Sequence, residues 1–106
     1  MRRARQAEIR ALEYFLKQNL YFLYHNKKVS GVEIDLIFLD QKGNIIFIEV
    51  KSLSQRGLVE GRLYKKQEER LLKAKLFFES IYSLPVEVRL ALVTREPSEV
   101  VDFPIL

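Results

Sequence analysis

Two segments of the sequence, Val32–Leu39 and Ile45–Lys51, alternate like β-strands but place charged residues on faces that are otherwise apolar. Successive side chains of a strand point to opposite faces of its sheet. One face of each segment is apolar throughout: Val32, Ile34, Leu36 and Phe38 in the first, and Ile46, Ile48 and Val50 in the second. The other faces are apolar at one end and charged at the other: Glu33, Asp35, Ile37 and Leu39, and Ile45, Phe47, Glu49 and Lys51. Because an exposed sheet face is usually polar, this pattern predicts a sheet covered by helices on both sides.

The charged positions of the two strands are expected to meet at one end of this sheet. Residues 40–44 have the composition of a hairpin loop, so Asp35 should lie across from Glu49 or its neighbour Ile48. Two carboxylates in contact repel each other unless a cation lies between them. A divalent ion held by Asp35 and Glu49 would remove the repulsion, and Lys51 could then stabilise a charged phosphate and orient or activate water. These are the elements of phosphodiester hydrolysis. The alternative is a solvated ladder of salt bridges at a sheet edge.

A further acidic residue lies in the first predicted helix, which runs from about Arg3 to Lys17. Its apolar residues recur at three- and four-residue steps, and Glu8 lies within that apolar stripe. A carboxylate that faces the core needs a partner. Glu8 is therefore expected to be a third metal ligand or to support one. The alternative is an ion pair with Arg5 at the rim of the helix.

The remaining segments complete an α-β-β-β-α-β order. They are a strand over Leu20–Tyr24, a turn over His25–Gly31, a mobile loop over Ser52–Arg62, a helix over about Leu63–Tyr82 with Leu71, Ala74, Phe78 and Tyr82 on one face, a strand over Val86–Val93, and a tail with a short edge segment. We expect one α/β domain over residues 1–106, with a mixed sheet flanked by helices. The hairpin strands should be antiparallel, and the second helix should cross over to a parallel strand.

Composition narrows the kind of metal and of partner. The chain has no cysteine and a single histidine, which excludes a thiolate zinc site and a histidine cluster. Oxygen ligands favour Mg²⁺, Mn²⁺ or Ca²⁺ over zinc. The net charge of +4 is compatible with a polyanionic partner. No apolar run approaches the roughly 20 residues of a membrane span, and the basic start lacks the apolar region of a secretory signal. We therefore expect a cytoplasmic protein with no membrane partner.

Three short motifs resemble the YraN-type endonucleases of the PD-(D/E)xK superfamily, which have the restriction-endonuclease-like fold and are related to archaeal Holliday-junction resolvases. The motifs are Glu33-Ile34-Asp35-Leu36-Ile37, Phe47-Ile48-Glu49-Val50-Lys51, and Lys66-Gln67 with Arg70-Leu71 at the start of a helix. The resemblance covers nearly the whole chain. It implies cleavage of DNA with Mg²⁺ or Mn²⁺ as cofactor, metal ligation by Asp35 and Glu49, and a catalytic Lys51. It also implies that Glu8 is the acidic residue of the first helix and Gln67 the polar residue of a fourth motif. Related resolvases act as dimers on branched DNA, so the resemblance is also compatible with a homodimer.

Basic residues of the second helix and of the loop before it are expected to contact DNA phosphates. They are Lys65, Lys66, Arg70 and Arg56. The alternative for the helix is a solvated face with pairs such as Glu69–Lys73. No base-reading motif is visible, so we expect recognition of DNA structure, branched or single-stranded, rather than of sequence. A catalytically silent nucleic-acid-binding or scaffold module on the same fold is the alternative function.

Overall fold

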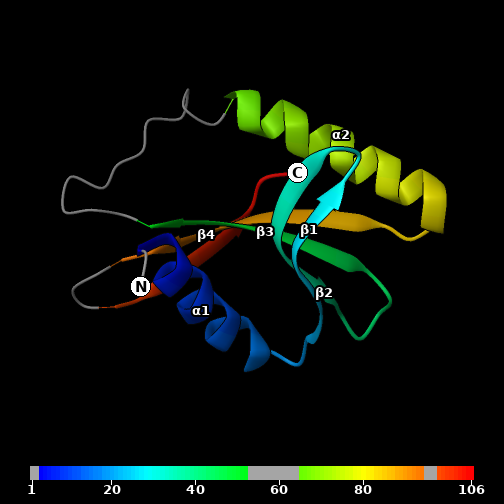
Figure 1. The fold of residues 1–106 in the computed structure, drawn as a ribbon. Coiled ribbons are helices and arrows are strands. Elements are labelled where there is room, and N and C mark those ends of the chain that lie inside the picture. Colours follow the sequence, from blue (N-terminus) through cyan, green and yellow to red (C-terminus); the bar gives the residue numbers. More distant parts are fainter. Residues whose placement is uncertain (1–2, 53–64, 95–97) are drawn as a thin grey trace.

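A five-stranded mixed sheet lies between two helices in the computed structural model, which describes residues 3–52, 65–94 and 98–106 (Figure 1). The elements in chain order are α1 (Arg3–Leu16), β1 (Tyr21–Val29), β2 (Val32–Leu39), β3 (Ile45–Ser52), α2 (Lys65–Tyr82), β4 (Val86–Val93) and β5 (Val100–Pro104). The strands are ordered β1-β2-β3-β4-β5; β3 and β4 are parallel, and the other neighbouring pairs are antiparallel. The predicted α/β class and the mixed sheet flanked by helices are confirmed.

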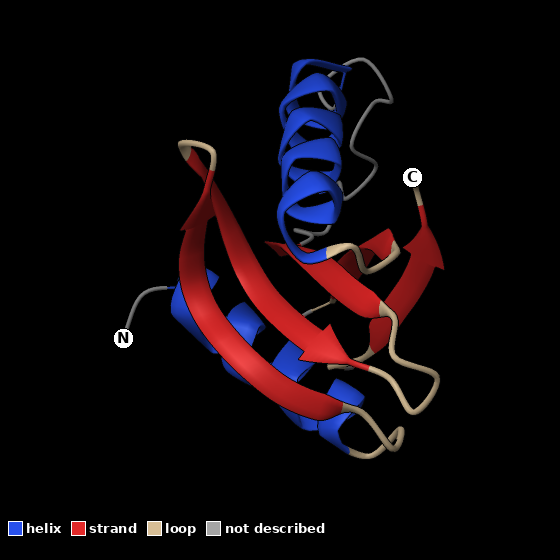
Figure 2. Ribbon diagram, turned by 90° about the vertical axis from the view of Figure 1, so that its right-hand side faces the viewer, coloured by secondary structure: helices blue, strands red, loops and turns tan. Residues whose placement is uncertain are grey.

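Each helix covers one face of the sheet and has its own apolar cluster (Figures 1 and 2). The α1 cluster is Ala7, Ala11, Phe15, Leu36, Phe38, Ile46, Ile48, Val50, Ala91 and Val93. The α2 cluster is Val29, Val32, Ile34, Ile37, Ile45, Phe47, Leu71, Ala74, Phe78, Val86 and Val88. Tyr82, predicted on the buried face of the second helix, is instead 59% exposed, because it ends α2 and packs on Phe78 rather than on the sheet. No helix in the described part of the chain combines the length and apolar character that a membrane crossing requires.

The first hairpin corrects the predicted turn over residues 25–31. Strand β1 continues to Val29, and the turn consists of Ser30 and Gly31 alone. Both turn residues have positive φ, 50° and 78°, as a two-residue hairpin turn with the twist of a sheet requires. The polar stretch from His25 to Lys28 resembled a loop because β1 is an edge strand whose side chains are exposed.

The alternation of β2 changes face at Asp35, which corrects the predicted apolar face of that strand. Val32 and Ile34 belong to the α2 cluster, whereas Leu36 and Phe38 belong to the α1 cluster. The pairing of β1 with β2 is interrupted at the same point, where Asn26 has a φ of 52° and is not a partner of Asp35. A residue in the left-handed region breaks the pleat locally, so the simple period of two cannot be carried across it.

The second hairpin fixes the register of β2 against β3. The Asp40 Oδ1 atom accepts hydrogen bonds from the backbone N–H groups of Lys42 (2.9 Å) and Asn44 (2.8 Å). Its Oδ2 atom accepts a third hydrogen bond from the Asn44 side-chain amide (3.1 Å). Gly43 takes a φ of 89° between them. This carboxylate therefore holds the turn that aligns Leu39 with Ile45 and the residues beyond them.

A polar network joins α1 to the other edge of the sheet. The Asp102 carboxylate of β5 accepts hydrogen bonds from the Tyr14 hydroxyl of α1 (2.5 Å) and from Nε of Arg89 in β4 (2.7 Å). Arg89 also pairs with Glu87 at 2.9 Å. These hydrogen bonds thus link α1 and β4 to the edge strand β5.

We expect Asp40→Ala to lower the free energy of unfolding by about 1–2 kcal/mol, because it removes the acceptor of three hydrogen bonds. Asp40→Asn is the matched control and should cost less, since its amide oxygen can still accept both backbone bonds. Urea unfolding followed by circular dichroism measures the difference. Equal stability of wild type and Asp40→Ala would contradict this account of the hairpin.

Candidate active site

Asp35 lies where β2 and β3 stop pairing. The ladder runs from the pair Leu39–Ile45 to the pair Leu36–Ile48 and ends there. Beyond that point the Oδ2 atom of Asp35 accepts a hydrogen bond from the backbone N–H of Val50 at 2.8 Å. A side-chain carboxylate thus takes the place of a backbone acceptor. The register agrees with the prediction that Asp35 lies across from Glu49 or Ile48.

Glu49 is the buried acidic residue of this region, with 4% of its surface exposed. It shares a side-chain hydrogen bond with Asp35, and the Gln67 amide of α2 donates a hydrogen bond to its Oε2 atom. The Lys51 ammonium lies 3.9 Å from the same oxygen and is 40% exposed. The structure therefore brings together Asp35, Glu49, Lys51 and Gln67, four of the residues predicted from the sequence.

The surroundings of Glu49 favour its protonated form. Burial raises the pKa of Glu49 to about 8, and the hydrogen bond and negative charge of Asp35 act in the same direction. The positive charge of Lys51 and the hydrogen bond from Gln67 lower this pKa but do not offset the burial. At neutral pH, the two carboxyl groups are expected to share one proton. A cation that bound both oxygens would replace this proton, so the donor set fits a hard divalent ion such as Mg²⁺ or Mn²⁺.

Glu8 contacts a different partner. Its Oε1 atom lies 3.0 Å from Nε2 of His25, and its side chain is 19% exposed. The Asn26 side-chain amide lies 3.2 Å from the same ring nitrogen. Glu8 thus has the partner that its position required, but this partner is neither Arg5 nor the acidic pair. This contact was not predictable from the sequence, because the polar composition of residues 25–31 is typical of a turn. No group of three or more metal-binding side chains occurs within residues 3–52, 65–94 and 98–106. The role of Glu8 as a metal ligand stays a prediction.

Of the four basic residues expected to contact DNA, only Arg70 has its side chain within the described part of the chain. Arg70 is exposed on α2, one turn after Gln67. Lys65 and Lys66 begin that helix, but their side chains lie outside the described residues, and so does the whole of Arg56.

A hollow of about 170 Å³ lies on the α1 side of the sheet, near the carboxyl ends of β3 and β4. Its lining consists of Gln6, Ala7, Arg10, Ser52, Val93, Thr94 and Ser98. Ser52 follows Lys51 in the strand, so the hollow opens on the face opposite the acidic pair. The sequence did not predict it, because its residues come from four separate segments.

Comparison with known sequences identifies one family. The sequence profile of the uncharacterised protein family UPF0102 matches residues 7–98. A UPF0102 protein of Cupriavidus necator is 33% identical over 98 residues, which cover 90% of this chain and 74% of that protein. A UPF0102 protein of Pseudomonas putida is 34% identical over 84 residues, covering 74% of this chain and 65% of that protein.

Comparison with solved structures confirms the predicted restriction-endonuclease-like fold. A repair endonuclease from Pyrococcus abyssi aligns with a TM-score of 0.55 and 18% identity over 84% of this chain and 38% of its own. The structure of an EndoMS–dsDNA complex aligns with a TM-score of 0.54 and 16% identity over 78% of this chain and 33% of its own. The chain therefore spans about a third of the length of these proteins. At such low identity the likeness concerns the fold alone.

We expect Glu49→Gln to raise the melting temperature at pH 8 in EDTA and to leave it almost unchanged at pH 4.5. The folded-state pKa of Glu49, about 8, lies above its ordinary value of 4.5, so the folded protein retains a proton that the unfolded chain loses. The free energy of unfolding therefore falls as pH rises from about 4.5 to about 8. Glutamine keeps a similar shape and cannot ionise.

Thermal unfolding between pH 4.5 and pH 8.5 measures this effect. Glu13→Gln, an exposed change on α1, is the control and should follow the wild-type profile. Parallel profiles for wild type and Glu49→Gln would show that the pKa of Glu49 is not raised.

Proposed function

This chain belongs to the UPF0102 family, and we propose that it is a metal-dependent endonuclease that hydrolyses DNA phosphodiester bonds, selecting DNA by structure rather than by sequence. The observation that carries this proposal is the buried Glu49 carboxyl group in contact with Asp35, beside the half-exposed Lys51 ammonium. A structural salt bridge has no need of two acidic groups that compete for one proton.

Each residue of the site has a separate task in this proposal. Asp35 and Glu49 would hold Mg²⁺ or Mn²⁺, with the Val50 carbonyl as a further candidate ligand. The bound ion would neutralise a phosphate oxygen and lower the pKa of water. Lys51 would place its positive charge beside the phosphate and orient the attacking water. Gln67 keeps the Glu49 carboxyl in position through its hydrogen bond, and the Val50 N–H does the same for Asp35.

DNA as the substrate is supported by charge and by the fold neighbours. One neighbour is a repair endonuclease, and the other was solved in complex with double-stranded DNA. The exposed Arg70 on α2 lies on the same side of the sheet as Lys51 and could contact the phosphate backbone. Glu8 would join the metal site only by exchanging its hydrogen bond with His25. A branched or single-stranded substrate and a homodimer are further parts of the proposal.

We expect Asp35→Asn, Glu49→Gln and Lys51→Met each to lower the rate of DNA cleavage by about 100-fold or more. Cleavage of linear, nicked, flapped and four-way DNA with Mg²⁺ or Mn²⁺ measures this rate, and EDTA should abolish it. Lys42→Met in the hairpin loop and Glu13→Gln on α1 are matched controls that should retain wild-type rates. Binding without turnover by the wild-type protein would instead indicate a catalytically silent DNA-binding module.

We also expect Mn²⁺ binding at pH 7 to release a proton, because the cation replaces the proton shared by the two carboxyl groups. Calorimetric titrations in two buffers of different ionisation enthalpy count the released protons. Asp35→Asn should weaken binding, and Glu49→Gln should abolish proton release. Binding with equal enthalpy in both buffers would contradict the replacement.

A further inference from the structure

An exposed aromatic and basic face lies on the edge strand next to the acidic pair. We call Tyr21, Tyr24 and Lys27 the β1 face. Their strand partners are Leu39, Ile37 and Ile34, which all pack in or against the α2 cluster, so the three side chains point to the α2 side of the sheet. Two irregularities put them there: a bulge between Phe22 and Tyr24, and the positive φ of Asn26.

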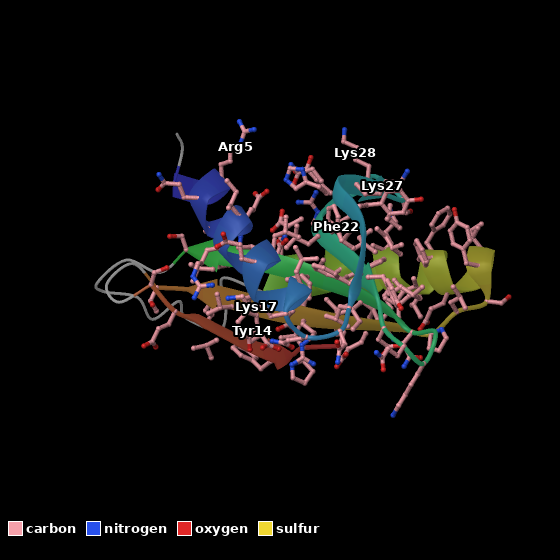
Figure 3. All side chains as sticks on the ribbon, turned by 90° about the horizontal axis from the view of Figure 1, so that it is seen from below. Arg5, Tyr14, Lys17, Phe22, Lys27 and Lys28 are labelled. Carbon is pink, nitrogen blue, oxygen red and sulfur yellow. The ribbon has the colours of Figure 1, made fainter. Side chains whose placement is uncertain are left out.

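The rings of the β1 face are available to a ligand. Tyr21 is 63% exposed and Tyr24 is 44% exposed. The Lys27 ammonium lies 4.6 Å from the centre of the Tyr24 ring. Figure 3 shows Lys27 and Lys28 projecting from the hairpin end of β1. An aromatic plane with an adjacent cation is the pairing that binds a nucleobase together with its phosphate.

The flank of α2 that faces the β1 face also carries a basic and an aromatic side chain. Lys75 donates a hydrogen bond to the Val86 carbonyl (2.9 Å), which identifies the flank that faces β4. Residues of a helix are about 100° apart, so Arg70 and Phe77 lie on the other flank, toward β1 and β2. Figure 2 shows α2 beside the curled β1–β2 hairpin. Arg70 is exposed, and Phe77 is 46% exposed.

Charge favours a nucleic acid over a second copy of the chain at this surface. Neither Lys27 nor Arg70 forms a salt bridge with a carboxylate of the described residues. Glu33, the partner of Lys28, lies between two residues of the α2 cluster and therefore points to the opposite face. A two-fold pairing of this surface with itself would bring like charges together without acidic partners.

The β1 face is also close to the acidic pair. Asp35 follows Ile34, the partner of Lys27, and precedes Leu36, the partner of His25. Two strand spacings, about 10 Å, separate β1 from β3 and Glu49. A strand of DNA whose phosphate lay at the acidic pair could therefore place its neighbouring bases on the Tyr24 and Tyr21 rings.

We propose that Tyr21, Tyr24 and Lys27, with Arg70 and Phe77 opposite, bind the unpaired bases of a DNA strand next to the cleaved phosphate. The substrate class is then DNA with a single-stranded segment. This inference rests on the proposed nuclease function for its biological meaning, but the binding itself does not require cleavage.

Fluorescence anisotropy in EDTA tests the platform without hydrolysis. The probes are a labelled 15-nucleotide oligothymidine and a blunt duplex of the same length. Tyr21→Ala and Tyr24→Ala should each weaken binding of the oligothymidine by roughly 5-fold to 150-fold, as loss of one stacked base predicts. Binding of the blunt duplex should change less than about 2-fold, since its bases cannot stack on the platform.

The control is Tyr82→Ala, which removes an equally exposed tyrosine (59%) from the other flank of α2 and should leave both affinities unchanged. Tyr24→Trp keeps an aromatic ring at this position and should therefore bind the oligothymidine about as tightly as the wild-type protein. This result would show that the weaker binding of Tyr24→Ala comes from the lost ring and not from a change in folding. Lys27→Ala should reduce the slope of log K against log salt by about 1.

The outcomes separate this inference from the proposed function. Oligothymidine binding that is insensitive to Tyr21→Ala and Tyr24→Ala overturns the platform, even if the protein cleaves DNA normally. Tyrosine-dependent binding without turnover in Mg²⁺ or Mn²⁺ supports the platform and overturns the nuclease function. A wild-type dimer that these substitutions convert to a monomer, with DNA binding unchanged, would show that the surface binds a second copy and would also overturn the platform.

Discussion

The contact between the carboxyl groups of Asp35 and Glu49 is the constraint on which the arrangement of this protein depends. A buried acidic pair is unfavourable unless a proton or a cation lies between its oxygens. The fold meets this cost through fixed donors: the Val50 N–H for Asp35, and the Gln67 amide for Glu49. Each donor comes from a different element, so the site exists only when β2, β3 and α2 are all in place. The same donors that stabilise the pair also fix the orientation of both carboxyl groups.

The sandwich of helix, sheet and helix explains why the burial is concentrated at β3. This central strand is covered on one face by the α1 cluster and on the other by the α2 cluster, and all its residues from Ile45 to Val50 are buried. The edge strands have the opposite character. Strand β1 exposes eight of its nine residues, and β5 is held through the contacts of Asp102 with Arg89 and Tyr14. The β1 edge of the sheet is therefore exposed to solvent, while β3 at its centre is buried.

The sequence predicted the elements whose patterns are local, and it failed where a contact is made over distance. Strand alternation and the loop at Asp40 were sufficient for the β2–β3 register, and with it for the meeting of Asp35 and Glu49. The change of face at Asp35 was not predictable from a period of two, because it occurs at a local irregularity of the sheet, opposite the left-handed Asn26 of β1. The polarity of an edge strand made His25 resemble a turn, so its contact with Glu8 was missed. Nothing in the sequence indicated the link from Tyr14 to Asp102, since these residues are 88 positions apart.

The hydrogen bond from Gln67 to Glu49 has a consequence for the order of folding. Asp35 and Glu49 belong to one hairpin, whose short loop closes at low entropic cost, whereas the parallel pairing of β3 with β4 requires the long crossover through α2. The hairpin can therefore assemble while both carboxyl groups are still hydrated and ionised. Docking of α2 then removes their water and places the Gln67 amide on Glu49. In a cation-free solution near neutral pH, this docking step takes up a proton from the solvent, so its equilibrium is coupled to pH.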